Sequence, residues 1–256
     1  MVWAMSGHSK WSTIKHQKGA ADAKRGQLFT KLTREIIFAA RSGGGSPDGN
    51  SRLRLAIQKA KDARMPNDNI DRAIKKGEGA TEGQNMFEAT YEGYGPGGTA
   101  VIVDVVSDNR NRVVQELRSV FARAGGNLGE TGSVAWMFDM RGVICVSAEG
   151  KDVDELTMLA IDAGAEDVNP LGDFVEIYTK PVELELVRKT LEQTGIVVEN
   201  AELARVAKTA ISLDEHTSSQ VLRMLDLLES MDDVQNVYNN ADISDEIVER
   251  HHSQSK

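Results

Sequence analysis

The side chains whose type and spacing could do chemistry are mainly cations near the start of the sequence. Through residue 41, only Asp22 and Glu35 oppose them with negative charge. Fixed cations at helical spacing can contact the phosphates of a polyanion and release its counterions. Aromatic rings among them can stack on unpaired bases. The residues that would form such a surface are His8, Lys10, Trp11, Lys15, His16, Lys18, Lys24, Arg25, Lys31, Arg34 and Arg41.

A helix must position the later cations of this set, which lie between residues 24 and 41. Apolar residues recur there at spacings of four, four and three, which predicts a helix from about residue 26 to 41: Leu28, Leu32, Ile36 and Ala39. At 100° per residue, the cations on the opposite side are Lys24, Lys31, Arg34 and Arg41. We expect a cationic strip that is open to solvent. The alternative is a solvated basic helix with Trp11 buried in a core.

A second polar cluster spans residues 108–112. Asn109 is placed to cap a helix that runs to about Arg123. A cap does not explain Arg110 and Arg112, because the helix dipole disfavours cations in the first turn. A contact of these two arginines with phosphate or with an acidic partner is one interpretation, and simple exposure to solvent is the other.

Motifs for catalysis and for bound cofactors are missing from the sequence. The glycines at 95–98 lie between two predicted strands, without the Lys-Ser/Thr pair of a phosphate-binding loop. Cys145, the single cysteine, lies in an apolar strand-like run and is expected to be a buried structural thiol. His251 and His252 lie in a polar tail. We therefore expect a protein that is not an enzyme and that holds no metal or cofactor.

Charge divides the chain into two unlike parts. The 256 residues carry a net charge of −9, but residues 1–80 hold 16 basic and 7 acidic side chains, and residues 81–256 hold 14 and 32. This asymmetry of +9 against −18 points to two surfaces with different partners, or to two solvated faces. No apolar run is long enough to cross a bilayer, and the first residues do not resemble a signal peptide. The expected compartment is the cytoplasm.

The remaining periodicities predict an α+β protein of three domains. Three helices and a linker make a basic helical bundle at 1–80, and Gly77 is expected to end the third helix. Strands near 88–94 and 99–107, with a hairpin at 95–98, begin a second domain at 81–132. Residues 133–206 read as β-α-β-β-α-β, the order of a ferredoxin-like unit, with a turn at 169–172 and a helix opened by Pro181. A helix at 214–229 and a strand at 234–238 are expected to complete the earlier sheet, so that the second domain is split as 81–132 plus 207–246, before a flexible tail at 247–256.

The sequence resembles the YebC family over nearly its whole length. Eight segments carry the resemblance: 7–11 (GHSKW), 15–26 (KHQKGAADAKRG), 52–57 (RLRLAI), 91–98 (YEGYGPGG), 108–112 (DNRNR), 125–130 (GGNLGE), 132–138 (GSVAWMF) and 232–238 (DDVQNVY). Two departures are visible. Residues 1–4 precede the usual start, so Met5 is a candidate initiator, and Gln17 stands where the family often has a basic residue.

The resemblance implies a helical N-terminal domain, a split α+β domain and an inserted ferredoxin-like domain. It also implies a cytoplasmic, non-enzymatic regulator of gene expression. Family members are described as DNA-binding transcriptional regulators, as translational activators of cytochrome c oxidase in mitochondria, or as factors for ribosomes stalled on proline-rich stretches. The expected partner is therefore promoter DNA or ribosomal RNA, and ribosomal proteins are further candidate partners. The alternative function is a protein–protein adaptor that uses a basic arm and an acidic face.

Overall fold

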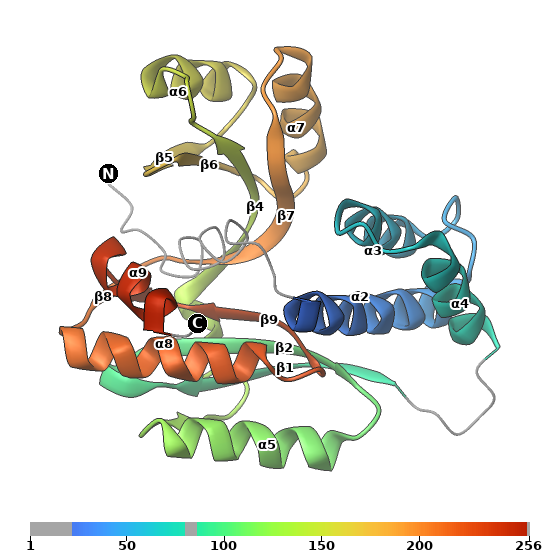
Figure 1. Ribbon diagram of the computed structural model, residues 1–256, viewed down its shortest axis with the longest axis vertical. Helices are drawn as coiled ribbons and strands as arrows, with labels where there is room; N and C mark the ends of the chain where they lie inside the picture. Colours follow the sequence, from blue (N-terminus) through green and yellow to red (C-terminus); the bar gives the residue numbers. More distant parts are fainter. Residues whose placement is uncertain (1–21, 80–85, 255–256) are drawn as a thin grey trace. The chain divides into compact units, whose positions relative to one another are not determined.

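The computed structural model describes residues 22–79 and 86–254 (Figure 1). The described chain divides into two compact units. One contains residues 22–79, 86–133 and 219–237, and the other contains residues 134–218 and 238–254. The α+β class is confirmed, whereas the domain boundaries at residues 80, 132, 206 and 246 stay predictions. Among the described residues, no helix combines the length and the apolar character needed to cross a membrane.

Three helices follow one another at the start of the first unit, as the apolar spacing predicts. They are α2 (Asp22–Gly43), α3 (Ser51–Asp62) and α4 (Asn67–Glu78). Their inward faces form one core around the fully buried Ile36, Leu53 and Ala56. Asn50 joins two of the helices, because its side chain accepts a hydrogen bond from the Leu53 amide and donates to the Ala39 carbonyl of α2. Burying these faces positions the cations on the outer sides of the helices.

Two expectations for the helical segment are wrong in detail. Leu28, expected on the apolar face of α2, is 39% exposed, because the core of the helices begins one turn later at Leu32. Gly77, expected to end the third helix, lies inside α4. A Cβ atom at Gly77 would be 2.7 Å from both the Ala40 Cβ and the Ile37 carbonyl oxygen of α2. Glycine therefore allows α4 to lie directly against α2.

The first unit also contains a four-stranded sheet. Strands β1 (Phe87–Tyr94) and β2 (Ala100–Ser107) are antiparallel and joined by a short 3₁₀ turn at Pro96–Gly98. The order is β3-β1-β2-β9, where β3 is Asn127–Leu128 and β9 is Val234–Asn239. Between β2 and β3, α5 (Arg110–Arg123) buries Leu117 and Phe121. The prediction that the strand near 234 returns to the sheet begun near Glu88 is thus confirmed.

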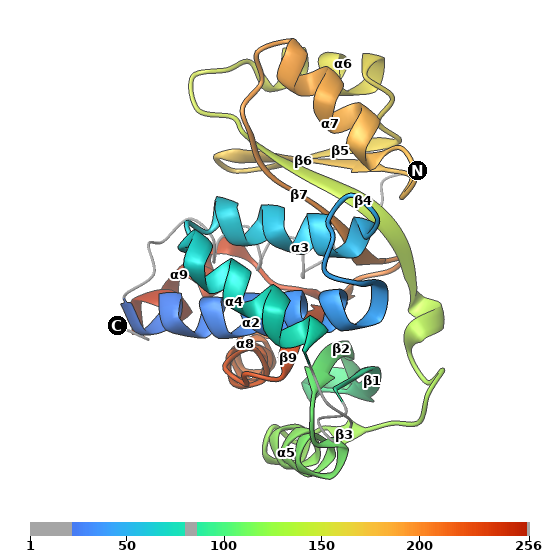
Figure 2. The same cartoon turned by 90° about the vertical axis from the view of Figure 1, so that its right-hand side faces the viewer.

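The second unit contains the predicted ferredoxin-like order. Its elements are β4 (Phe138–Ser147), α6 (Val153–Asp162), β5 (Asp167–Leu171), β6 (Phe174–Thr179), α7 (Leu184–Gln193) and β7 (Val198–Ala207). All neighbouring strands are antiparallel in the order β5-β6-β4-β7. Both helices pack on one face of this sheet (Figure 2). After β7, this unit also contains β8 (Ile211–Ser212), β10 (Ala241–Asp242) and α9 (Asp245–Gln254). The helix α8 (Glu215–Glu229) begins in this unit, but its residues from 219 onward belong to the first unit.

Two boundaries of the ferredoxin-like segment differ from the prediction. Pro170, expected in a turn at 169–172, lies within β5, and the chain turns at Gly172, where φ is +55°. The strand tolerates proline because β5 is at the edge of the sheet. Pro181 does not open α7, which begins at Leu184 after one turn.

Candidate nucleic-acid interface

The structure describes only part of the predicted cationic surface. His8, Lys10, Trp11, Lys15, His16 and Lys18 lie outside the described residues. Lys24 lies in α2, and its side chain is also outside the described part. Arg25 is exposed in the first turn of α2, and Arg41 is half-buried in the last turn. The interface can therefore be built from Lys31, Arg34, Arg110 and Arg112, together with cations that the pattern did not single out.

Lys31 and Arg34 contact the protein itself, which corrects the expectation of a continuous open strip. The Lys31 ammonium donates to the backbone carbonyl of Glu229 at 2.7 Å. Glu229 is the last residue of α8, and a cation is favoured at a helix C-terminus. One turn further along α2, the Arg34 guanidinium forms an ion pair with the Asp233 carboxylate. The middle of α2 therefore binds the segment that joins α8 to β9.

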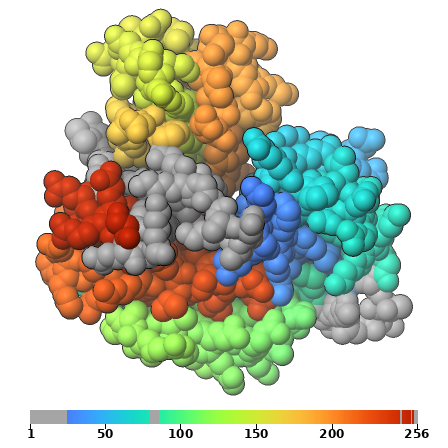
Figure 3. Space-filling model, in the orientation of Figure 1, coloured from blue at the N-terminus to red at the C-terminus, as the bar shows by residue number. Residues whose placement is uncertain are grey.

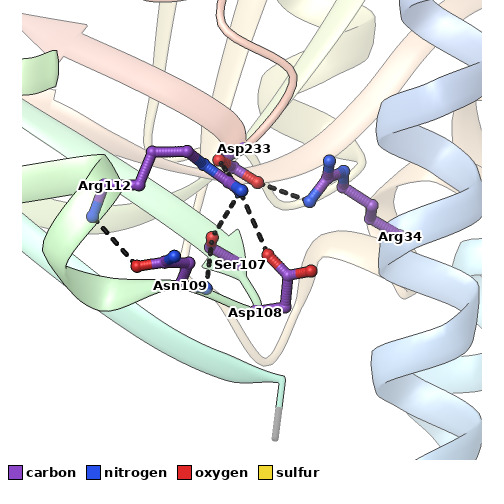
Figure 4. Close-up of polar contacts among 6 residues, drawn as sticks. All are labelled: Arg34, Ser107, Asp108, Asn109, Arg112 and Asp233. Atoms are coloured by element: carbon purple, nitrogen blue, oxygen red, sulfur yellow. Dashed lines mark hydrogen bonds and ion pairs between the residues drawn. The ribbon is translucent and has the colours of Figure 1, made fainter. Parts of the chain in front are cut away.

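Asp233 is the centre of a polar junction that also includes Arg112 (Figure 4). The Arg112 guanidinium donates to Asp233 Oδ2 at 2.8 Å and to Asp108 Oδ1 at 3.0 Å. The Asp233 side chain is only 6% exposed, and its backbone carbonyl accepts a hydrogen bond from the Val106 amide of β2. The hydrogen bond to Asp233 raises the pKa of the Arg112 guanidinium above its ordinary value. One nearly buried carboxylate thus bridges cations from α2 and α5.

This junction explains the two arginines in the first turn of α5. Asn109 caps the helix as predicted, because its side chain accepts from the Arg112 amide at 3.0 Å. The unfavourable helix dipole at Arg112 is offset by two carboxylates, Asp108 and Asp233. The Arg110 guanidinium lies over the Phe87 ring, 4.7 Å from its centroid. Arg112 therefore has its acidic partner inside the chain, and Arg110 has an aromatic one.

Arg52 is a further cation of the helical segment that has an internal partner. Its guanidinium donates to both carboxylate oxygens of Glu88 in β1, and it also lies over the Phe38 ring. The hydrogen bond to Glu88 raises the pKa of Arg52. Ion pairs within the chain thus neutralise part of the positive charge of residues 1–80. The described cations that remain exposed there are Arg25, Arg54, Lys61, Arg64, Arg72, Lys75 and Lys76.

A shallow hollow between α2 and α4 brings two of these exposed cations together. It measures about 230 Å³ and is lined by Thr33, Asn69, Arg72, Ala73 and Lys76. Arg72 is held along α4 by hydrogen bonds to the Asp68 carbonyl and the Asn69 side chain. Among the residues that the structure describes, no acidic side chain lines the hollow. A hydroxyl, an amide, a guanidinium and an ammonium around one space form a donor set suited to a phosphate oxygen.

The sequence contains a pattern that indicates this hollow, but a count of charges along the chain does not reveal it. Asn69, Arg72 and Lys76 recur at spacings of three and four, which places them on one side of α4. Their position beside Thr33 depends on the close approach of α4 to α2 at Gly77, which no local pattern predicts. Cys145 is buried, as predicted. Within residues 22–79 and 86–254, no three His, Cys, Asp or Glu side chains are grouped to hold a metal ion.

Comparison with known proteins identifies the same family in two segments of the chain. Residues 9–80 match the TACO1/YebC N-terminal domain, and residues 86–241 match the TACO1/YebC second and third domain. The chain belongs to the TACO1/YebC family. The helical N-terminal region and the α+β class that the resemblance implies agree with the fold described above.

Relatives in the TACO1/YebC family match the chain almost from end to end. A probable transcriptional regulatory protein of Dehalococcoides mccartyi strain 195 is 61% identical over 98% of this chain and 100% of its own length. One from Desulfosudis oleivorans is 55% identical over 96% of this chain and 100% of its own. The crystal structure of a conserved hypothetical protein from Aquifex aeolicus superposes with a TM-score of 0.83 at 48% identity, covering 91% of this chain and 96% of that one.

Proposed function

We propose that this protein regulates gene expression by binding nucleic acid through its N-terminal helical segment. The observation that carries the proposal is the hollow between α2 and α4, where Arg72, Lys76, Asn69 and Thr33 meet without an acidic neighbour in the lining. The names of the relatives, probable transcriptional regulatory proteins, support a regulatory role. The protein would act in the cytoplasm, without catalysis and without a cofactor.

In this proposal the helices contact the phosphate backbone, and the bases are not read directly. Arg72 and Lys76 lie one turn apart on α4 and present fixed positive charge on the same side as the Thr33 hydroxyl. Such contacts fix the position of a protein on a nucleic acid but carry no sequence information. Additional cations from the N-terminal residues, including Lys10, Lys15 and Lys18, would extend the contact along the backbone.

The nucleic-acid partner is either promoter DNA or ribosomal RNA, and charge favours the ribosome. Residues 81–256 carry a net charge of −18, which a long uniform polyanion would repel. A ribosome also offers basic proteins to an acidic surface. Crosslinking in cells followed by sequencing of bound DNA and bound RNA distinguishes the two. Recovery mainly of ribosomal RNA would indicate translation, and discrete promoter peaks would indicate transcription.

The binding surface is tested by reversing the two charges of the hollow. The variant Arg72→Glu with Lys76→Glu is compared with Lys151→Glu with Lys189→Glu, which makes the same charge change at exposed lysines of the other unit. Affinity for a labelled DNA duplex and for a labelled ribosomal-RNA stem-loop is measured by fluorescence anisotropy over a salt series. We expect only the first variant to lose the contacts, with the log–log salt slope reduced by about 1.4 to 1.8 for two phosphates. Equal effects of both variants would contradict the proposed surface.

A protein adaptor is the second candidate, and the contact of α2 with Asp233 favours it. Lys31 and Arg34 bind a carbonyl and a carboxylate of this same chain, so the helix is suited to acidic protein surfaces as well as to phosphates. The two candidates predict different results in a pull-down. Capture of the partner that survives nuclease treatment would favour the adaptor, and loss of capture would favour nucleic-acid binding.

A further inference from the structure

The outer faces of α6 and α7 carry large apolar side chains that do not belong to the core. Met158 and Ile161 on α6 are 61% and 57% exposed, and Leu186 on α7 is 66% exposed. The opposite faces of the same helices fill the core of the ferredoxin-like segment with Leu156, Ala160, Val187 and others. Single exposed apolar residues are ordinary, but here they occur on two helices of the same layer. Figure 3 places both helices on one face of the molecule.

Acidic side chains flank the exposed apolar residues of α6, whereas α7 also carries the exposed Lys189 three positions after Leu186. On α6, the exposed residues follow one helical side at spacings of three and four, with acids at both ends and apolar residues between them: Asp154, Glu155, Met158, Ile161 and Asp162. No lysine or arginine occurs in α6. On α7, Arg188 is engaged by Glu185 and Glu192. Over residues 138–207, fifteen acidic and six basic side chains give a net charge of −9.

We infer that this face binds a basic, amphipathic segment of a partner protein. The apolar side of that segment would bury Met158, Ile161 and Leu186, and its cations would lie beside the carboxylates of α6. Methionine suits such a surface, because its flexible thioether adapts to partners of different shape. Helical segments of this kind bind through apolar anchors at spacings of three and four.

The negative charge of this face favours a basic segment over the other partners that an apolar face could bind. A second copy that packed through the same face would bring a net charge of −9 against itself, and like charges disfavour such a contact. Nucleic acid and anionic membranes are repelled for the same reason. A segment that carries both lysines or arginines and apolar residues is the chemistry that complements the surface. This inference is independent of the proposed nucleic-acid contact, which uses other residues.

The experiment uses the full chain and two synthetic peptides. One is an amphipathic helical peptide of leucine and lysine, and the other has the same lysines with every leucine replaced by alanine. Dissociation constants are measured by calorimetry at two salt concentrations. We expect the leucine peptide to bind at least about tenfold more tightly, which is the effect of one well-buried apolar anchor. Equal binding of both peptides would overturn the inference, because charge alone would then explain the contact.

Two pairs of variants locate the contact on the surface. Met158→Gln with Leu186→Gln removes the anchors without changing charge, and Leu55→Gln with Leu227→Gln makes matched changes at exposed leucines elsewhere, which are 52% and 46% exposed. Only the first pair should abolish the preference for the leucine peptide, with thermal unfolding unchanged in both. A full preference that persists in the Met158/Leu186 variant would overturn the inference. A wild-type dimer that this variant converts to a monomer in light scattering would also overturn it, in favour of self-association.

Discussion

At the scale of single residues, Asp233 limits the access of a ligand to two of the predicted contact residues. Its carboxylate accepts hydrogen bonds from Arg34 and Arg112, which come from α2 and α5. Each guanidinium would otherwise be available to a phosphate, because each arginine side chain is 25% or more exposed. A carboxylate and a phosphate compete for the same fork of donors. Asp233 therefore acts against the binding that the sequence assigned to Arg34 and Arg112.

Replacing Asp233 tests this competition directly. Asp233→Asn removes the charge and keeps the shape, so we expect tighter binding of a labelled nucleic acid together with a loss of about 1 to 3 kcal/mol in the free energy of unfolding. Binding is measured by anisotropy, and stability by urea unfolding. The control is Asp232→Asn, which makes the same charge change at the exposed neighbour. If Asp232→Asn raises the affinity equally, general charge rather than competition at the junction is responsible.

At the scale of elements, the contact between α2 and α4 depends on the absence of a side chain at Gly77. A Cβ there would be 2.7 Å from the Ala40 Cβ and the Ile37 carbonyl oxygen, and backbone cannot move aside as easily as a flexible side chain. We expect Gly77→Ala to destabilise the protein by about 1 to 3 kcal/mol by forcing the helices apart. Because the hollow lies between these helices, nucleic-acid affinity should fall as well.

The matched control is the same substitution on α2. Nothing lies within 4 Å of the position that a Cβ would take at Gly26. Gly26→Ala should therefore stabilise the helix by about 0.5 to 1 kcal/mol, through the higher helix propensity of alanine. Urea unfolding of both variants checks the opposite signs. A stabilising Gly77→Ala would mean that the close approach of α2 and α4 is wrong.

Hydrogen bonds at the start of α8 make the stability of the protein depend on pH. Hydrogen bonds from the Thr217 amide and then from its hydroxyl lower the pKa of Asp214 below its ordinary value. The stabilisation is therefore complete above the unfolded pKa and is lost as pH falls through the lowered, folded one. Wild type and Asp214→Ala should differ in melting temperature at neutral pH and converge in acid. A difference that stays constant down to low pH would contradict the charged cap.

At the scale of the whole molecule, opposite charges occur in different parts of one chain. Positive charge in residues 1–80 attracts a polyanion, and the net charge of −18 in residues 81–256 opposes it. Repulsion of this kind acts over the Debye length, which shortens from about 30 Å at 0.01 M salt to about 8 Å at 0.15 M. The acidic part therefore weakens binding mainly at low ionic strength, where it would suppress unspecific contacts.

This repulsion is tested by neutralising two exposed carboxylates in turns of the second unit. Glu149→Gln with Asp173→Asn reduces the negative charge away from the surfaces proposed above. We expect tighter nucleic-acid binding in dilute salt, with the difference vanishing near physiological salt. Anisotropy titrations at several salt concentrations measure it. A gain that persists at high salt would indicate that these residues contact the nucleic acid directly.

The sequence predicts the helices and strands of this molecule better than the contacts of its basic side chains. Spacings of three and four or of two reveal most helices and strands, because burial repeats along each element. Pro170 was assigned to a turn because its place at a sheet edge depends on which strands pair. Arg34 and Asp233 are separated by 199 positions, so a local count of charge records the arginine and misses its partner. The cationic side of α2 was therefore predicted, whereas its docking on the α8–β9 segment was not.

The pairing of β2 with β9 also has a consequence for biosynthesis. The ribosome completes β2 at Ser107, but β9 begins only at Val234, after the whole ferredoxin-like segment has emerged. Until then, β2 has a free row of amides and carbonyls next to fully buried valines and isoleucine. Open strand edges recruit other strands. A nascent chain that stops before Val234 therefore offers other polypeptides the place that β9 is made to fill.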